Sequence, residues 1–230
     1  PYPAYREPDT FKINRDILIA PDPAESNGHL EKGPNIKNLP AFEPLPDTFK
    51  GPVLLKLEDN ISTDEIMPAG TLVLPFRSNI PEISKFVFDP VDQNFYDRAR
   101  NTEHKTFFIV AGKNYGQGSS REHAALAPRY LGLRMVLAKG YARIHAQNLI
   151  NFGIHPLLFS EGGDWDRINQ GDILSCKDLK ERICNHDSLV VENDSRKESY
   201  KCTFHLNSRE RDMILKGSLL NLVRENKRSS

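Results

Sequence analysis

Cysteine is scarce in this sequence, and its spacing matches no familiar kind of cysteine site. Cys176, Cys184 and Cys202 fall in the last quarter of the 230 residues and form no C-x-x-C pair. Such an odd, widely spaced set does not make a disulfide framework, a zinc site or the binding loop of an iron–sulfur cluster. We therefore expect reduced thiols, some of them in the core, in a chain that binds no metal.

Long apolar runs and net charge are missing as well. No apolar run approaches the ~20 residues needed to span a bilayer, and the first residues lack the apolar core of a signal peptide. Lys and Arg together number 31, as do Asp and Glu, so the formal net charge is zero. This balance argues against an extended nucleic acid partner, which needs a positive field. We expect a soluble cytoplasmic protein without membrane contact, with the mitochondrial matrix as the alternative compartment.

Proline is unevenly distributed. Residues 1–50 hold nine of the sixteen prolines and show no sustained apolar periodicity. Because proline fixes φ and removes a backbone donor, we predict an extended arm over residues 1–50 and a compact domain over residues 51–230. Apolar residues such as Phe11, Ile13 and Ile17 indicate that part of this arm packs on a surface. The first methionine is Met67, which fits either loss of an initiator methionine or excision from a longer polypeptide.

Buried-strand runs and helical stretches alternate in the rest of the chain. Strands are predicted at residues 53–57, 106–111, 134–138, 154–159, 172–176, 188–192 and 199–205. Helices are predicted at residues 90–101, 120–130, 142–151 and, with a break at Gly217, 208–225. The strand–helix–strand order in the middle of the chain predicts an α/β domain whose sheet is at least partly parallel.

The segment with the most chemical information joins a buried strand to a helix at residues 112–123. Its glycines allow sharp turns, and Ser119 or Ser120 suits the helix N-cap. A helix start attracts anions, and Arg121 adds a planar fork that matches a carboxylate. It is not a P-loop, because no Gly-Lys-Ser/Thr ends it. A tight turn with a serine cap accounts for the same residues, so the pattern alone leaves both interpretations open.

Several segments resemble the aconitase family, most of all the active-site stretch of that family. They are N-Y-G-Q-G-S-S-R-E-H-A-A-L-A-P-R at residues 114–129, A-R-I-H at 142–145, G-I-H-P-L at 153–157, and T-D-E-I with A-G at 63–66 and 69–70. The resemblance is specific from about residue 59 to residue 159. It implies a three-layer β/β/α swivelling domain of aconitase type. The proline-rich arm resembles the linker to the cluster-bearing domains in single-chain aconitases.

The resemblance also implies roles for individual residues. Ser119 corresponds to the catalytic base, while Ser120 and Arg121 correspond to residues that bind a substrate carboxylate. Arg77 matches an arginine that binds a further carboxylate, and Asp64 falls at an active-site aspartate that orients its neighbours. The implied reaction is that of a tricarboxylic acid cycle lyase, which interconverts citrate and isocitrate through cis-aconitate. The 4Fe-4S cluster of the family lies in other domains, so those domains would be partners of this chain.

A serine base needs a strong positive field. A serine hydroxyl ionises far above neutral pH, and each pKa unit corresponds to ~1.4 kcal/mol. A helix N-terminus contributes at most ~2 kcal/mol, whereas a donor placed for a developing oxyanion contributes ~3–4 kcal/mol. Arg121, backbone N–H groups and cations from other domains would have to converge on Ser119. We therefore expect the isolated chain to be inactive.

Two other functions are alternatives to a role in an aconitase. The chain resembles the small subunits of isopropylmalate and homoaconitate dehydratases, which share the G-S-S-R-E-H core. It could also be an anion- or RNA-binding module without catalysis, although zero net charge disfavours RNA. Outside the main motif, we expect His123 and His145 to be packing or capping residues. Surface or interdomain ion pairs account for Arg129 and Arg143 as well as any active-site role does.

Overall fold

The structure, a computed structural model, describes residue 3 and residues 6–10, 14–20 and 31–228. The chain divides into residues 1–33 and a compact unit from residue 34 onward. Residues 34–50, which the sequence assigns to the arm, therefore belong to the compact unit. Phe42, Leu45 and Phe49 are buried there, and the Leu45 N–H donates to the Leu215 carbonyl over 3.0 Å. In the first unit Ile17 is exposed, and Phe11 and Ile13 lie outside the described residues.

Strands and helices alternate through the compact unit. Its strands are β1 (Phe49–Lys56), β2 (Phe107–Ala111), β3 (Leu133–Ala138), β4 (His155–Phe159), β5 (Ile173–Cys176), β6 (Ser188–Asn193) and β7 (Glu198–Thr203). Its helices are α1 (Thr63–Ile66), α2 (Ile80–Ile83), α3 (Phe95–Asn101), α4 (His123–Leu131), α5 (Arg143–Asn151), α6 (Asp164–Arg167), α7 (Leu179–Asn185), α8 (Ser208–Lys216) and α9 (Leu219–Arg228). Short 3-10 turns at Leu74–Phe76 and Ser84–Phe86 flank α2.

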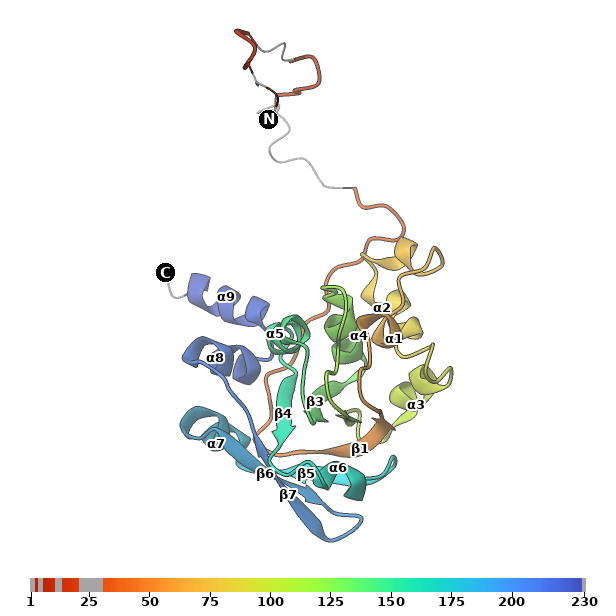
Figure 1. The fold of residues 1–230 in the computed structure, drawn as a ribbon, viewed down its shortest axis with the longest axis vertical. Helices are drawn as coiled ribbons and strands as arrows, with labels where there is room; N and C mark the ends of the chain where they lie inside the picture. The colour runs from red at the N-terminus through yellow and green to blue at the C-terminus, as the bar shows by residue number, and fades with distance from the viewer. Residues whose placement is uncertain (1–2, 4–5, 11–13, 21–30, 229–230) are drawn as a thin grey trace. The chain divides into compact units, whose positions relative to one another are not determined.

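The strands close into a barrel in the order β1-β2-β3-β4-β7-β6-β5. In Figure 1, β5, β6 and β7 lie at the bottom of the view and helices α4 and α5 lie above them. Strands β1 to β4 pair in parallel, as expected from the strand–helix–strand order. The β4–β7, β7–β6, β6–β5 and β5–β1 pairs are antiparallel. The predicted partly parallel sheet is thus confirmed. Closure of this sheet into a barrel is not predicted by any local signal in the sequence.

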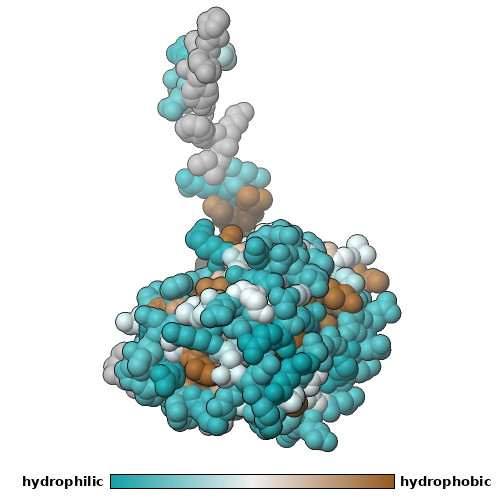
Figure 2. Space-filling model, turned by 60° about the horizontal axis from the view of Figure 1, so that its bottom comes forward, coloured by the Kyte–Doolittle hydropathy of each residue, from teal (hydrophilic) through white to brown (hydrophobic). Residues whose placement is uncertain are grey.

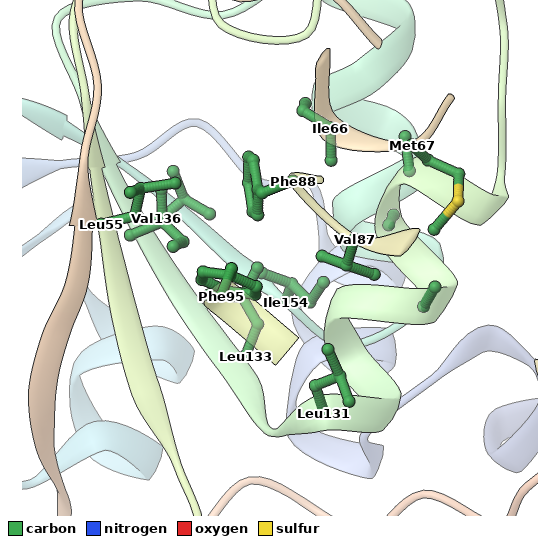
Figure 3. Close-up of a cluster of buried hydrophobic side chains, with 14 of the residues drawn as sticks. Leu55, Ile66, Met67, Val87, Phe88, Phe95, Leu131, Leu133, Val136 and Ile154 are labelled. Atoms are coloured by element: carbon green, nitrogen blue, oxygen red, sulfur yellow. The ribbon is translucent and has the colours of Figure 1, made fainter. Parts of the chain in front are cut away.

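Side chains alternate between two cores along the parallel strands. Phe108 and Val110 of β2 face the barrel interior with residues of β5, β6 and β7, whereas Phe107 and Ile109 face the helices. The helix-side core is drawn in Figure 3, where Phe88 and Phe95 lie against strand residues. Strands of the antiparallel half, strands of the parallel half and covering helices therefore form successive layers. This confirms the β/β/α expectation.

The predicted strands agree with the structure to within four residues at each end, whereas the helices differ more. Helix α3 begins at Phe95 instead of Pro90. Helix α4 begins at His123 instead of near Ser120, and its N-cap residue is Glu122 in αR conformation without a side-chain cap hydrogen bond. The prediction that Ser119 or Ser120 caps this helix is wrong. The sequence analysis does not predict the short helices α1, α2, α6 and α7, because at most two residues are buried on each and no apolar periodicity marks them.

The surface agrees with the composition of the chain. The face shown in Figure 2 is mostly hydrophilic, with small scattered apolar patches. Among the described residues, no helix is both long and apolar enough to cross a membrane.

Two histidines are buried as neutral rings. His145 on α5 is 1% exposed and lies against Tyr115, with ring centroids 5.1 Å apart, and His155 on β4 is fully buried against Phe204 at 4.6 Å. None of their ring nitrogens has a hydrogen-bond partner within the part of the chain that the structure describes. Burial lowers the pKa of His145 to about 4 and, with a smaller contribution from Arg211, lowers the pKa of His155 to about 3.

These pKa values predict a loss of stability in mild acid. The unfolded imidazoles bind a proton below about pH 6.5, whereas the folded ones bind it only near pH 4 and pH 3. The stability is therefore complete above pH 6.5 and falls as the pH falls. Between pH 7 and pH 5 each buried ring should cost about 2 kcal/mol of unfolding free energy.

Urea unfolding at the two pH values measures this effect. His155→Leu should remove about half of the histidine-dependent loss, and His104→Gln, which changes an exposed histidine, should leave it unchanged. A pH dependence unaffected by His155→Leu would show that this ring does not drive the effect.

Candidate active site

The glycine-rich loop is held against the turn that follows β1. The Gly116 and Gln117 N–H groups both donate to the Ile61 carbonyl, over 2.8 and 3.1 Å, and the Thr63 N–H donates to the Gln117 carbonyl over 2.8 Å. Because β1 and β2 are parallel neighbours, the segments that leave their carboxyl ends meet at one edge of the sheet. Ligands of such sheets commonly bind beyond that edge.

Two contacts explain why the serine pair does not enter the helix. Gly116 takes φ +80° and lies so close to α5 that an added Cβ would meet the His145 ring at 2.1 Å. Further along, Gly118 takes φ +99°, and the buried Thr63 donates from Oγ1 to the Ser119 carbonyl over 3.1 Å. These contacts hold Ser119 outside the helix, so that α4 begins only after Arg121.

Asp64 and Arg121 form an ion pair across the two segments. A capping box fixes the short helix that carries Asp64: the Glu65 N–H donates to Ser62 Oγ over 3.2 Å, and the Ser62 N–H donates to Glu65 Oε2 over 2.7 Å. Arg121 Nη1 donates to Asp64 Oδ1 and, over 3.2 Å, to the Met67 carbonyl. The Asp64 side chain is 62% exposed and that of Arg121 23%, so the pair is accessible from outside.

Three of the predicted residues line one pocket of about 270 Å³. They are Arg77, Ser120 and Arg121. The rest of the lining is largely apolar and includes Met67, Val73, Leu74 and Ile83. The His123 Nε2–H donates to the Arg77 carbonyl over 2.9 Å and so ties the segment after α1 to the start of α4.

Ser119 and Asp64 lie beside this pocket and do not line it. Both are exposed. The backbone N–H groups of residues 119–123 donate no hydrogen bond to any residue that the structure describes. Together with the start of α4 and the Arg121 guanidinium, they offer a cluster of donors for an anion. The five predicted residues are thus brought together on one open face.

Comparison with known proteins shows the family to which this chain belongs. The family model of the aconitase C-terminal domain matches residues 82–162. The chain is 33% identical to the methanogen homoaconitase small subunit of Methanocaldococcus jannaschii, over 75% of this chain and 89% of that subunit. The chain belongs to the aconitase C-terminal domain family.

Two further similarities bear on this aconitase C-terminal domain. The crystal structure of 3-isopropylmalate dehydratase from Methanocaldococcus jannaschii matches it with a TM-score of 0.63 and 30% identity, over 78% of this chain and 95% of that one. Mitochondrial aconitate hydratase of Gracilaria gracilis is 32% identical over 74% of the chain. The chain spans only 25% of that enzyme and less than a third of other mitochondrial relatives.

The cysteines of this aconitase C-terminal domain do not fit an iron–sulfur cluster. Cys176 and Cys202 are buried in the barrel core, where burial raises the pKa of both thiols, that of Cys202 to about 12. Cluster ligands are thiolates that converge on one site. Within the described ranges, no three His, Cys, Asp or Glu side chains are grouped to hold a metal ion.

Several contacts of the site could not be found from the motif alone. Thr63 belongs to the T-D-E-I segment, and nothing in that motif indicates that its hydroxyl donates to the Ser119 carbonyl. His123 was expected to pack or cap, and it instead fixes the backbone at Arg77. The expected packing role of His145 is confirmed, because its ring lies against Gly116. Only the adjacency of the two segments, which the sequence does not give, reveals these roles.

Proposed function

We propose that this chain supplies the base and the carboxylate-binding groups of an aconitate hydratase. The observation that carries the proposal is the meeting of Ser119, Ser120 and Arg121 with Asp64 and Arg77 on one open face. A tricarboxylate offers one carboxylate for Arg121 and a further one for Arg77. The relatives include a 3-isopropylmalate dehydratase and an aconitate hydratase, which supports the reaction class.

Ser119 acts as the base in this proposal. Its deprotonated hydroxyl removes a proton from the carbon next to a substrate carboxylate, and the negative charge that develops spreads onto that carboxylate. Arg121 and Ser120 donate to the carboxylate oxygens, so they bind more strongly as the charge grows. Asp64 holds the Arg121 guanidinium in place before substrate arrives. In the reverse direction Ser119 returns the proton.

The partner in this proposal is a cluster-bearing domain or subunit that covers the open face. It would supply the remaining positive field for Ser119 and the groups that handle the departing hydroxyl. Relatives that are small subunits, such as the methanogen homoaconitase small subunit, favour such a division. A 4Fe-4S cluster would reside in that partner.

A dehydratase with an alkyl-bearing substrate is the second candidate. The apolar lining of Met67, Val73, Leu74 and Ile83 would accept an isopropyl group, as in the similar 3-isopropylmalate dehydratase. Arg77 in the same pocket favours a carboxylate, since a buried aliphatic group gains nothing from a guanidinium. The balance therefore favours the tricarboxylate.

Substrate competition in the assembled enzyme tests the proposal. The chain joined to its partner should hydrate cis-aconitate, followed by its absorbance, and should turn over isopropylmalate at least 100-fold less efficiently. Arg77→Leu should reduce this preference by lowering kcat/KM for cis-aconitate, whereas Arg100→Leu, on the exposed side of α3, should not. Preference for isopropylmalate in the unaltered enzyme would reject the proposal in favour of the second candidate.

A further inference from the structure

Two arginines are buried together far from the catalytic loop, where α4 ends and β3 begins. Arg129 is 4% exposed and Arg134 is 7% exposed. Arg129 Nη2 and Arg134 Nη1 both donate to the backbone carbonyl of Glu43, over 3.0 and 2.8 Å, and Arg129 Nε donates to the Phe152 carbonyl over 3.0 Å. Of the interpretations open for Arg129, a surface ion pair with a described residue is therefore contradicted.

The positive charge of this pair is not balanced by a close carboxylate. Neither guanidinium has an acidic group within 4.0 Å among the described residues, and their hydrogen-bond acceptors are neutral carbonyls. Burial, followed by repulsion from Arg134, lowers the pKa of Arg129 to about 9, and burial lowers the pKa of Arg134 to about 10. Buried charges in proteins are normally paired. A counter-charge is therefore missing here.

The two guanidinium groups border an open pocket of about 250 Å³. Lys105, Thr106 and Tyr130 line it together with Arg129, Arg134 and the 40–43 segment. Arg129 Nη1 and Arg134 Nε and Nη2 donate no hydrogen bond within the described part of the chain. None of the three is among its fully buried unpaired polar atoms, so each has accessible surface.

We propose that this pocket binds a small, doubly charged oxyanion such as phosphate or a phosphate monoester. Planar guanidinium forks match phosphate oxygens in pairs, and Lys105 at the rim adds a third positive charge. The three cations outweigh the partial negative charge of about half a unit at the C-terminal end of α4. The catalytic residues lie at the opposite end of that helix, so the two anion sites are separate.

Glu43 decides how strongly the oxyanion binds. Glu43 is one of the residues that line the pocket, its negative charge attracts both guanidinium groups, and the residue is exposed. Being outside ion-pair distance, it offsets the positive charge only in part, and it repels an incoming anion. Removing its charge should therefore strengthen anion binding.

Calorimetric titration of the full chain with inorganic phosphate, at fixed low ionic strength in chloride, measures this site. We expect this pocket to bind one phosphate per chain with a Kd on the order of 1 mM. Lys105→Gln should raise the Kd about fivefold or more and Glu43→Gln should lower it by a similar factor. Both side chains are exposed, so these variants should fold where a change at a buried arginine need not.

Two control variants distinguish this pocket from other anion sites. Lys180→Gln removes an exposed lysine on α7, and Arg121→Gln removes the guanidinium of the catalytic face, and neither should change the Kd. The proposal is overturned if no binding is detected up to about 10 mM phosphate. It is also overturned if Arg121→Gln weakens binding while Lys105→Gln does not, because the phosphate would then bind at the other anion site. Weaker binding by Glu43→Gln would overturn it as well, because Glu43 does not then repel the anion.

Discussion

Replacing Ser119 by alanine in the assembled enzyme is expected to lower kcat by about 10³- to 10⁴-fold, with little change in KM. The hydroxyl is exposed on the open face, and its backbone is fixed through the Ser119 carbonyl, not through its side chain. Loss of the hydroxyl should therefore remove the proton-transfer step and leave the loop intact. Steady-state hydration of cis-aconitate, compared with urea unfolding of the same variant, separates these two effects.

The matched control is Ser208→Ala, which removes an exposed hydroxyl from the first turn of α8. It should leave kcat unchanged. If Ser119→Ala keeps more than about a tenth of the activity, the base must be another group, because general-base catalysis typically contributes at least 10²-fold. Loss of activity together with loss of folding stability would instead indicate that the loop had changed.

The second large effect is expected for Arg121→Gln, which should lower kcat/KM by about 100- to 1,000-fold, through both KM and kcat. Arg121 is held by Asp64 and the Met67 carbonyl, and it borders the pocket. A charge-assisted hydrogen bond contributes about 1.5–3 kcal/mol, and each 1.4 kcal/mol is a factor of ten. Two such bonds to one carboxylate, each at the weaker end of this range, about 1.5–2 kcal/mol, give a factor of about 100 to 1,000. Kinetics with cis-aconitate over a range of concentrations gives KM and kcat separately.

Arg121→Lys and Arg182→Gln are the informative comparisons. Lysine keeps the charge but not the planar fork, so it should recover only part of kcat/KM. Arg182 is exposed on α7 and its loss should have no effect on kinetics. Full activity of Arg121→Lys would mean that Arg121 acts through charge alone, and full activity of Arg121→Gln would remove it from the site.

The elements of the central region could be predicted because their physical signals are local. The all-apolar run Phe107–Ala111 is a strand buried on both faces, and a left-handed Gly217 ends α8. The order of these elements predicted parallel pairing without any knowledge of distant contacts. The similarity of residues 114–129 to the aconitase family then indicated which loop carries the site.

The features of the fold and the site that could not be predicted depend on contacts between segments far apart in the sequence. The predicted serine cap of α4 does not form, because Thr63 and Ile61, more than fifty residues earlier, make hydrogen bonds with the backbone of the loop. The sequence left the role of Arg129 open between an active-site position and an ion pair, because its hydrogen bond to the distant Glu43 carbonyl leaves no local signal. Closure of the barrel requires β5 to return to β1, and no periodicity in either strand encodes this pairing.

That closure has a consequence for how the chain is used. A ring of paired strands has no edge at which another chain could add, so the barrel needs no neighbouring domain to protect it from aggregation. The same unit can then be carried either within a long polypeptide or as a free-standing chain. Its relatives include both arrangements, from a quarter of the Gracilaria enzyme to 89% of the Methanocaldococcus subunit.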